Sequence, residues 1–527
     1  MSAPGRPASV PVVHVAGAAS EALAPGALAT LDGEPLARFL ADRRWFGGKG
    51  SPPRGARVAH VIPLDLAPPA SPAVLAVVEV AGDDGRVARY QLPLTVREVG
   101  GDNGGGGPGA VLARVESAGG RGSLLFDATE DRGFREALGA LFARGASFGA
   151  AKGTARWVVE PLAGDAGTSG PLGDARLLAA EQSNTSLVYG DRAILKLFRR
   201  VEPGEHPDVE IGRFLAASTA FRNTPALLGV LRLAISGETE AVAGMLQRFV
   251  PGSRDGWAHA LGRAAEFFAG REPAGLFADD ARELGRVTRA LHEALAAGTG
   301  EAFAPLPAGA TDVARWAAAT RRAMSEALAL LAARADGLGL AEPARREAAA
   351  VLAARGELAA RVDRAAALLE GHAGMRIRHH GDYHLGQVLR APDGTFFIID
   401  FEGEPARSLA ERRERHSPLR DVAGMVRSFS YAAAVGAVEA GQGPGADAAR
   451  WEDAARAAFL TAYFAEPDGA PAPFLPDTPG AAHALLALFE LEKLFYELAY
   501  ELNNRPAWTW VPLGAVARLL QTDPARD

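Results

Sequence analysis

The chain has 527 residues, 48% of them hydrophobic, and a formal net charge of −7, so it is long enough for several domains with a substantial core. This acidic balance gives no global attraction to nucleic acids or anionic membranes, and neither is an expected partner. The sequence has no cysteine, which rules out disulfides and thiolate metal sites and fits a cytoplasmic protein. No run approaches the roughly 20 apolar residues of a membrane helix, so we expect no membrane span.

The first part of the chain predicts a small N-terminal cap subdomain over residues 28–110. Residues 1–27 are rich in Ala, Pro and Gly without periodicity and predict a poorly ordered lead-in. Residues 36–49 predict a short helix that ends at a Gly-Gly turn, and two strand-like runs around a DDG turn then predict a β-hairpin. The glycine-rich tract 100–109 lacks the Lys-Ser/Thr of a phosphate-binding P-loop, so we interpret it as a linker.

The remainder of the chain divides near residue 250. Strand-like runs continue through 111–250, which we assign to a β-rich, nucleotide-binding lobe. Beyond it, Ala, Leu, Arg and Glu dominate with helical spacing over 280–370 and 417–503, which predicts a mainly α-helical C-terminal lobe over 251–527. The predicted fold class is therefore α+β with two lobes, between which a ligand could sit.

The stretch HHGDYHLGQVL at 379–389 places several polar side chains in an otherwise apolar segment. Asp382 is followed five positions later by Gln387, and an apolar run that predicts a strand then ends at Asp400. A carboxylate that accepts a hydroxyl proton, with an amide and a second carboxylate that hold Mg²⁺ on a triphosphate, is the set used for phosphoryl transfer in the protein-kinase-like fold. We predict Asp382 as the catalytic base, and Gln387 and Asp400 as ligands of Mg²⁺, which prefers hard oxygen donors.

Two other interpretations of this stretch compete with phosphoryl transfer. In the first, HGD is an ordinary turn and Asp400 merely ends a strand, but two elements in register followed by Glu402 make this less favoured. In the second, the alternating His380, Asp382 and His384 bind zinc, which leaves Asp400 unexplained. We therefore keep the phosphoryl-transfer interpretation, with the histidines supporting the loop.

The segment 379–433 strongly resembles bacterial maltokinases, members of the aminoglycoside-phosphotransferase-like branch of the kinase fold. The similarity extends to RRWFGGKG at 43–50, to 181–215 and to 494–508, and it covers roughly residues 35–515. It implies transfer of the γ-phosphoryl group of ATP to the anomeric hydroxyl of maltose, which gives maltose 1-phosphate for α-glucan (glycogen) synthesis. The implied cofactors are ATP and Mg²⁺, and a trehalose synthase, to which related enzymes can be fused, is a candidate partner.

In the β-rich lobe, Lys196 is the predicted phosphate anchor, because the alternating strand AILKLF points it away from its apolar neighbours. A helix predicted to begin near residue 207 carries Glu210, which could hold this lysine as the kinase lysine–glutamate pair does. Glu205 and Asp208 are substitutes for Glu210. The resemblance implies that a polar turn contacts the phosphates, through Ser183, Asn184, Thr185 and Ser186. The backbone where the lobes join is predicted to bind adenine, at Gln247, Phe249 and Val250.

The helix predicted over 490–505 carries a polar stripe with two tyrosines, formed by Lys493, Tyr496, Glu497, Tyr500, Glu501 and Asn504. Hydrogen-bonding groups beside flat aromatic rings suit a sugar; a solvated face fits the pattern equally well, and the resemblance favours the sugar site. Three further residues complete the predicted substrate set, namely His384, Glu402 and Arg420. Arg420 either contacts the sugar or pairs with Glu402 or Glu404, and Asp421 is the predicted N-cap of the next helix.

The leading hypothesis is an ATP- and Mg²⁺-dependent maltokinase. Its nearest rival is a kinase of another small hydroxylated acceptor, such as glucosamine or an aminoglycoside. Lys493 and Arg505 beside the glutamates of the stripe favour a neutral sugar over a polycationic one. The alternative of a different class is a catalytically inactive kinase-like binding module, which we disfavour because all the side chains expected for turnover are present.

Overall fold

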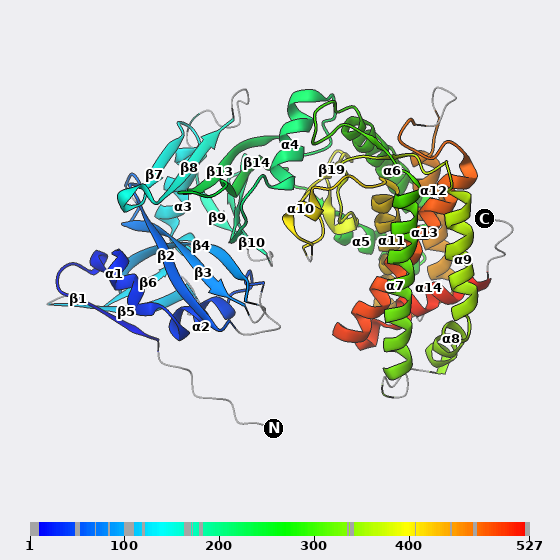
Figure 1. The fold of residues 1–527 in the computed structure, drawn as a ribbon, viewed down its shortest axis with the longest axis horizontal. Coiled ribbons are helices and arrows are strands. Elements are labelled where there is room, and N and C mark those ends of the chain that lie inside the picture. The colour runs from blue at the N-terminus through cyan, green and yellow to red at the C-terminus, as the bar shows by residue number, and fades with distance from the viewer. Residues whose placement is uncertain are drawn as a thin grey trace. The chain divides into compact units, whose positions relative to one another are not determined.

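The computed structural model describes most of the chain, namely residues 10–47, 53–68, 70–82, 85–99, 110–118, 122–162, 170, 172–178, 183–273, 275–334, 337, 342–405, 407–442, 445–466 and 472–521. The predicted glycine-rich linker at 100–109 lies outside these residues, as do 48–49 at the end of the first predicted helix. The chain folds as two compact units, Met1–Arg213 with Pro225–Pro251, and Phe214–Thr224 with Gly252–Asp527 (Figure 1).

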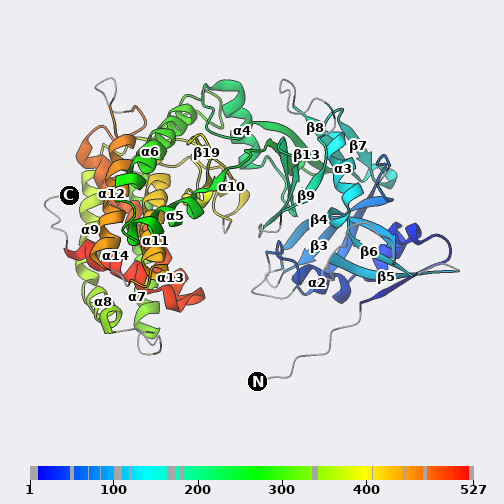
Figure 2. The same cartoon turned by 180° about the vertical axis from the view of Figure 1, so that it is seen from behind.

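The first unit begins with a mixed sheet in the order β1-β5-β6-β4-β3-β2, with a short strand β12 paired to β4. Four of its strands, β3, β4, β5 and β6, are labelled in Figure 2. Its strands are β1 (Val12–Val15), β2 (Gly55–Leu64), β3 (Ala73–Ala81), β4 (Val87–Glu98), β5 (Val111–Ser117), β6 (Ser123–Asp127) and β12 (Arg200–Val201). The predicted hairpin is confirmed, since β3 and β4 pair antiparallel across the DDG turn. The predicted helix is present but shorter, as α2 (Glu34–Ala41), preceded by the single turn α1 (Pro25–Leu28).

Two predictions for this region need correction. The lead-in is ordered from Val12 onward, because β1 pairs in parallel with β5 and the side chain of Ala22 is fully buried. The cap subdomain does not end at residue 110, because β5 and β6 belong to the same sheet as β4. The glycine-rich tract falls between two strands of one sheet, so the composition break is not a domain boundary.

A second sheet of the first unit has the order β7-β8-β13-β14-β11-β10-β9. Its strands are β7 (Ala146–Gly149), β8 (Ala155–Pro161), β9 (Ala175–Leu177), β10 (Asn184–Tyr189), β11 (Ala193–Phe198), β13 (Leu227–Ile235) and β14 (Ala241–Arg248). Strand β3 is buried on both faces: Leu75 and Val77 belong to the core of this second sheet, whereas Val74 and Val78 pack with α2. A strand covered on both sides becomes continuously apolar, which explains the run AVLAVV.

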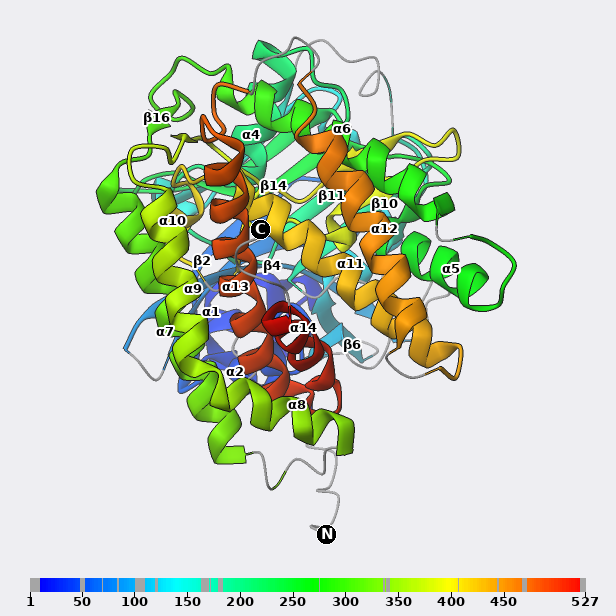
Figure 3. The same cartoon turned by 90° about the vertical axis from the view of Figure 1, so that its right-hand side faces the viewer.

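The second unit is mainly helical, as predicted, and also carries two small sheets (Figure 3). Its long helices are α5 (Gly256–Phe268), α6 (Gly275–Ala296), α7 (Ala310–Arg334), α8 (Glu342–Ala353), α9 (Arg355–Leu368), α11 (Leu419–Glu439), α12 (Ala446–Tyr463), α13 (Pro479–Asn504) and α14 (Trp510–Gln521). The small strands are β15 (Arg254–Asp255), β18 (Val388–Arg390) and β19 (Phe396–Ile398) in one sheet, and β16 (Leu306–Pro307) with β17 (Met375–Arg376). None of the described helices is long and apolar enough to cross a membrane.

Helix α11 is the centre of the helical unit, and it packs against α5, α12 and α13. Residues from all round it are buried, including Val422, Ala423, Met425, Ser428 and Ala434. A helix that is apolar on every side belongs inside a domain rather than on its surface. The polar residues that α11 does carry therefore need a specific explanation.

Candidate active site

The loop that carries HHGD is held against α11 by one carboxylate. Asp421 is 2% exposed; its Oδ2 accepts the backbone N–H of His380 at 2.7 Å and its Oδ1 accepts that of Gly381 at 2.9 Å. The prediction that Asp421 is a helix N-cap is wrong, because α11 begins at Leu419 with Pro418 in the cap position. Asp421 instead fixes the backbone immediately before Asp382.

The same face of α11 contacts the loop at two further points. At Gly424 an added Cβ would lie 2.5 Å from the backbone oxygen of Tyr383, so only glycine lets the loop lie this close to the helix. One helical turn later, Ser428 Oγ accepts the backbone N–H of Leu385 at 3.2 Å. The spacing of 421, 424 and 428 follows one helix face, so a single rigid element positions the whole loop.

Asp421 is charged although it is buried. Burial pushes the pKa of its carboxyl group upward, but the hydrogen bond from His292 and the nearby histidines outweigh burial and hold the pKa well below its usual value. His292 Nε2 donates to Asp421 Oδ2 at 3.2 Å, because a carboxylate can only accept, which leaves Nδ1 to accept the hydroxyl of Tyr463 at 2.8 Å. This chain of three buried side chains keeps the loop anchor ionised.

The histidines of the loop support its conformation. His380 Nε2 donates to the backbone oxygen of Ile399 at 2.9 Å, so its Nδ1 is the acceptor that faces the N–H of Asp382 at 3.4 Å. His384 Nδ1 accepts the N–H of Gly386 at 3.0 Å, and burial lowers the pKa of its ring, which favours the neutral form. These ring nitrogens are used to fold the loop and join it to the strand before Asp400.

The predicted metal ligands lie at neighbouring positions of one hairpin. Strands β18 and β19 pair antiparallel, and the N–H of Ile399 donates to the backbone oxygen of Gln387 at 3.0 Å, so Gln387 lies opposite the residue before Asp400. Asp400 adopts φ of 68°, a left-handed conformation that costs a non-glycine residue about 1 kcal/mol or more. An amide oxygen and a carboxylate at one strand end are hard donors, and this pair fits Mg²⁺.

A cavity of about 130 Å³ lies at Asp382 and is also lined by Glu404, Arg420, Glu492 and Tyr496. The ion pairs predicted for Arg420 with Glu402 or Glu404 are wrong. Its guanidinium group pairs with Glu492 on α13, at 3.0 and 3.2 Å, while Arg407 Nε donates to Glu404 at 2.8 Å.

A larger cavity of about 520 Å³ shares Gly424, Lys493 and Tyr496 with the first. We call the two together the acceptor cavities. Tyr496 and Tyr500 are 45% and 44% exposed, and their rings stack with centroids 6.5 Å apart. The other aromatic walls come from different elements and were not predicted from the sequence: Trp257, Tyr431 and Trp508. Because they come from separate parts of the sequence, no local pattern joins them.

The members of the predicted polar stripe on α13 have three kinds of surroundings: the two glutamates are paired, Lys493 lies near a tyrosine ring, and Asn504 bonds to its own helix. Glu497 is buried and accepts Arg427 Nη2 at 2.9 Å, and Glu501 accepts the Tyr431 hydroxyl at 3.0 Å and Arg505 Nη2 at 2.6 Å. Lys493 lies 5.1 Å from the centroid of the Tyr496 ring. Asn504, the last residue of the stripe, does not line either acceptor cavity. Its side-chain amide donates to the backbone oxygen of Tyr500 on the same helix.

Of the remaining substrate candidates, His384 lines the larger cavity. Glu402 lies two residues beyond Asp400, and its backbone oxygen accepts Arg412 Nη1 at 3.3 Å. The substrate roles of both residues stay predictions.

In the first unit, Lys196 is on β11 as predicted and only 7% exposed. Its Nζ lies 3.6 Å from Oδ2 of Asp208, which is fully buried on the first turn of α4 (Pro207–Ser218). Asp208 was the substitute for Glu210 in the sequence analysis, and the described ion pair places it beside the lysine. Glu210 is on the same turn, and its role stays a prediction.

The residues predicted to contact the phosphates lie on both faces of the second sheet of the first unit, and their phosphate-binding role stays a prediction. Ser186 lies opposite Lys196 in the β10–β11 pairing, so both side chains are on one face of the sheet. Thr185 faces the other way, where its Oγ1 accepts a hydrogen bond from Nε of the buried Arg199 at 2.7 Å. Ser183 is exposed and Asn184 begins β10; the preceding residues 181–182 lie outside the described part of the chain.

The segment predicted to bind adenine follows β14. Gln247 is buried within the sheet, where it pairs with Ile194 of β11. The N–H of Phe249 donates to the backbone oxygen of Arg192 at 3.0 Å. That donor is therefore used within the first unit, and an adenine contact from this segment needs another backbone group, such as one of Val250.

Comparison with known proteins shows what this chain is similar to. Residues 39–131 match the maltokinase N-terminal cap domain, which agrees with a cap that extends past residue 110. A glucosamine kinase from Streptacidiphilus jiangxiensis is 30% identical over 381 residues, which are 71% of this chain and 78% of that protein. One from Mycolicibacterium smegmatis is 28% identical over 348 residues, which are 66% of this chain and 79% of that protein.

A solved structure of a glucosamine kinase in complex with glucosamine, ADP and inorganic phosphate has a TM-score of 0.62 to this chain, with 24% sequence identity. The alignment covers 92% of this chain and 99% of that one, so the predicted kinase-like fold, β-rich first and helical second, is confirmed. The chain therefore belongs to the aminoglycoside-phosphotransferase-like sugar kinases that include the glucosamine kinases and carry a maltokinase-type N-terminal cap.

Proposed function

We propose that this sugar kinase transfers the γ-phosphoryl group of ATP to the anomeric hydroxyl of maltose and releases ADP and maltose 1-phosphate. The proposal is supported by the match of its N-terminal cap to the maltokinase cap domain. The observation that carries it is that four carboxylates of the acceptor cavities are paired with arginines, which favours a neutral sugar. A trehalose synthase, which supplies maltose by isomerising trehalose, is the proposed partner.

In the proposed reaction, the Asp382 carboxylate accepts the proton of the sugar hydroxyl while that oxygen forms a bond to the γ-phosphorus. The bond from the γ-phosphorus to the bridging oxygen breaks, and the negative charge leaves on ADP. Lys196 binds the phosphates, and Asp208 keeps the lysine oriented. Gln387 and Asp400 would hold Mg²⁺, which neutralises phosphate charge when bound.

A neutral acceptor is favoured because four carboxylates of the acceptor cavities already have a cationic partner. Glu404 pairs with Arg407, and the other three pairs are Glu492–Arg420, Glu497–Arg427 and Glu501–Arg505. Lys493 adds a positive charge. A cationic substrate would have to compete with these guanidinium groups, whereas hydroxyls and flat sugar faces can use the paired oxygens and the tyrosine rings.

Glucosamine is the second candidate acceptor. The relatives at 28–30% identity are glucosamine kinases, and the exposed Glu439 on the wall of the larger cavity offers a carboxylate for an ammonium group. If glucosamine is the substrate, Glu439→Gln should raise its KM and leave that of neutral sugars unchanged.

The deciding experiment measures ADP release from ATP and Mg²⁺ with maltose, glucosamine, glucose and an aminoglycoside, with Asp382→Asn as the blank. We expect the highest kcat/KM with maltose, and ³¹P NMR should show the phosphate on the anomeric oxygen. Turnover of glucosamine without maltose turnover would overturn the maltose assignment. Nucleotide binding with no turnover of any acceptor would instead favour the inactive binding module.

A further inference from the structure

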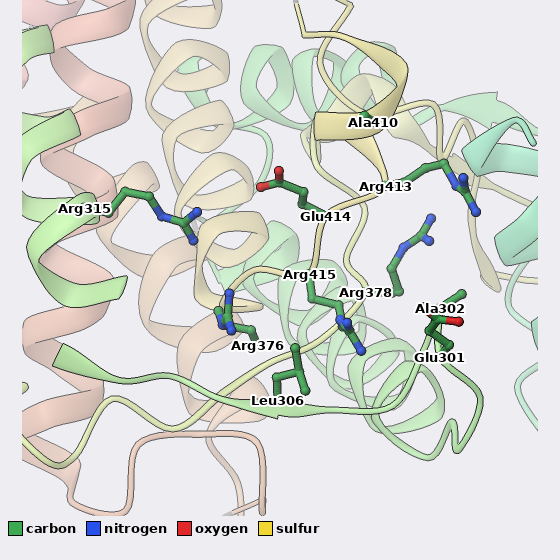
Figure 4. A pocket seen from close by; sticks show the side chains of 10 residues that line it. All are labelled: Glu301, Ala302, Leu306, Arg315, Arg376, Arg378, Ala410, Arg413, Glu414 and Arg415. Carbon is green, nitrogen blue, oxygen red and sulfur yellow. The ribbon is translucent and has the colours of Figure 1, made fainter. Parts of the chain in front are cut away.

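The helical unit contains a third cavity, of about 660 Å³, which shares no lining residue with the acceptor cavities. We call it the arginine cavity (Figure 4). Its walls come from the segment after α6, from α7, from β17 and the residues after it, and from the turn α10 (Leu409–Arg412) with the segment beyond. The lining residues are Glu301, Ala302, Leu306, Arg315, Arg376, Arg378, Ala410, Arg413, Glu414 and Arg415.

The charge of this cavity opposes that of the whole chain. Five arginines line it against two glutamates, in a protein of net charge −7. Behind the wall, Asp312 pairs with Arg315 at 3.0 Å and with Arg376 at 3.2 Å. Arginines therefore outnumber carboxylates in the lining, and a concave surface concentrates the field of the charges that line it.

Parts of the wall are built into the fold. Arg378 is 1% exposed, and its guanidinium carbon lies 5.2 Å from the centroid of the Phe303 ring. Arg415 Nη1 donates to the backbone oxygen of Ala304 at 2.7 Å, and the pairing of β16 with β17 fixes Arg376 opposite Leu306. Burying a guanidinium group is costly, so Arg378 is a fixed part of the wall, whereas Arg315 is exposed and the other three arginines are half-buried.

We propose that the arginine cavity binds a phosphorylated small molecule of about the size of a sugar phosphate. Guanidinium groups bind phosphate oxygens with two parallel hydrogen bonds, and several of them around one concave site suit a dianion. The volume is in the range of small-ligand pockets, roughly 300–1,000 Å³. The two glutamates and the backbone of the wall offer acceptors for hydroxyl groups. The lining residues come from several separate segments of the chain that meet around one concavity, which favours a small molecule over an acidic protein segment.

The test uses isothermal titration calorimetry on the full chain with glucose 6-phosphate, inorganic phosphate and glucose. Arg315→Gln and Arg413→Gln each remove one cavity guanidinium, and Arg322→Gln removes an exposed arginine of the same helix α7 outside the cavity. We expect one saturable site for glucose 6-phosphate and none for glucose. Each cavity variant should bind about tenfold more weakly, because it loses a charge-assisted hydrogen bond, and Arg322→Gln should bind as the wild type does.

The outcomes separate the alternatives. Equal affinity for inorganic phosphate would support the site and identify free phosphate as a sufficient ligand. Affinity that is unchanged in both cavity variants would place the ligand elsewhere, for example in the acceptor cavities, and would overturn the proposal. No saturable binding at millimolar concentrations, or binding of a polyglutamate peptide without binding of the phosphates, would overturn it as well.

Discussion

Replacing Asp421 by asparagine tests whether the loop anchor sets the position of the catalytic base. The carboxylate accepts two backbone N–H groups, at 2.7 and 2.9 Å, and one histidine N–H at 3.2 Å. An asparagine keeps only one acceptor oxygen, and its NH₂ group would face one of the N–H groups that the carboxylate now accepts. The variant therefore loses at least one charge-assisted hydrogen bond and leaves a buried N–H without an acceptor, which costs about 2–4 kcal/mol.

If that cost appears as misplacement of Asp382, kcat should fall by roughly 30- to 1,000-fold, while the Kd for ATP stays within about twofold because Lys196 and Asp208 belong to the other unit. Steady-state kinetics and ATP titration measure the two quantities. Urea unfolding shows how much of the cost appears as lost stability instead. Asp453→Asn, at an exposed position on α12, is the matched control. Full turnover by Asp421→Asn would refute the reasoning that this carboxylate positions the loop.

Three further predictions concern the base, the sugar and pH. Asp382→Asn should lose most turnover while ATP binding, measured by calorimetry, stays nearly intact; wild-type kcat would contradict its role as base. Tyr500→Ala should raise KM for the sugar about tenfold, corresponding to about 1.4 kcal/mol of lost contact, with kcat little changed; an unchanged KM would remove this ring from the sugar site. Burial lowers the pKa of His379 to about 4, from 6.5 in the unfolded chain, so the unfolded state binds the extra proton between these pH values. The free energy of unfolding should fall by about 3 kcal/mol as pH decreases from 6.5 to 4, and urea melts of His379→Asn should lack this part of the slope.

The sequence was most informative where chemistry and periodicity coincide within a short segment. The loop and strand that carry Asp382, Gln387 and Asp400 follow from local spacing, and the structure has a hairpin whose strand ends just before Asp400. The stripe on α13 follows from helical periodicity in the same way. Neither requires knowledge of distant contacts.

The misses concern partners far apart in the chain. Asp421 is 40 residues from Gly381, and Arg420 is 72 residues from Glu492, so local patterns predicted a helix cap and a nearby ion pair. A sheet can also continue across a glycine-rich tract, which is why the predicted end of the cap at residue 110 was too early. Placing Asp208 beside Lys196 required the turn of α4 that faces β11.

The contacts along α11 have a consequence for how acceptor specificity can change. Its early turns hold the loop through Asp421, Gly424 and Ser428, and its later residues Tyr431 and Val435 line the larger cavity. The single helix α11 therefore fixes the distance between the loop that carries Asp382 and the wall of the larger cavity. A new acceptor can be accommodated by substitutions on α13 without disturbing this spacing, whereas a shift of α11 would move both ends together. We expect variants selected for a different sugar to accumulate changes on α13 and to leave this face of α11 unaltered.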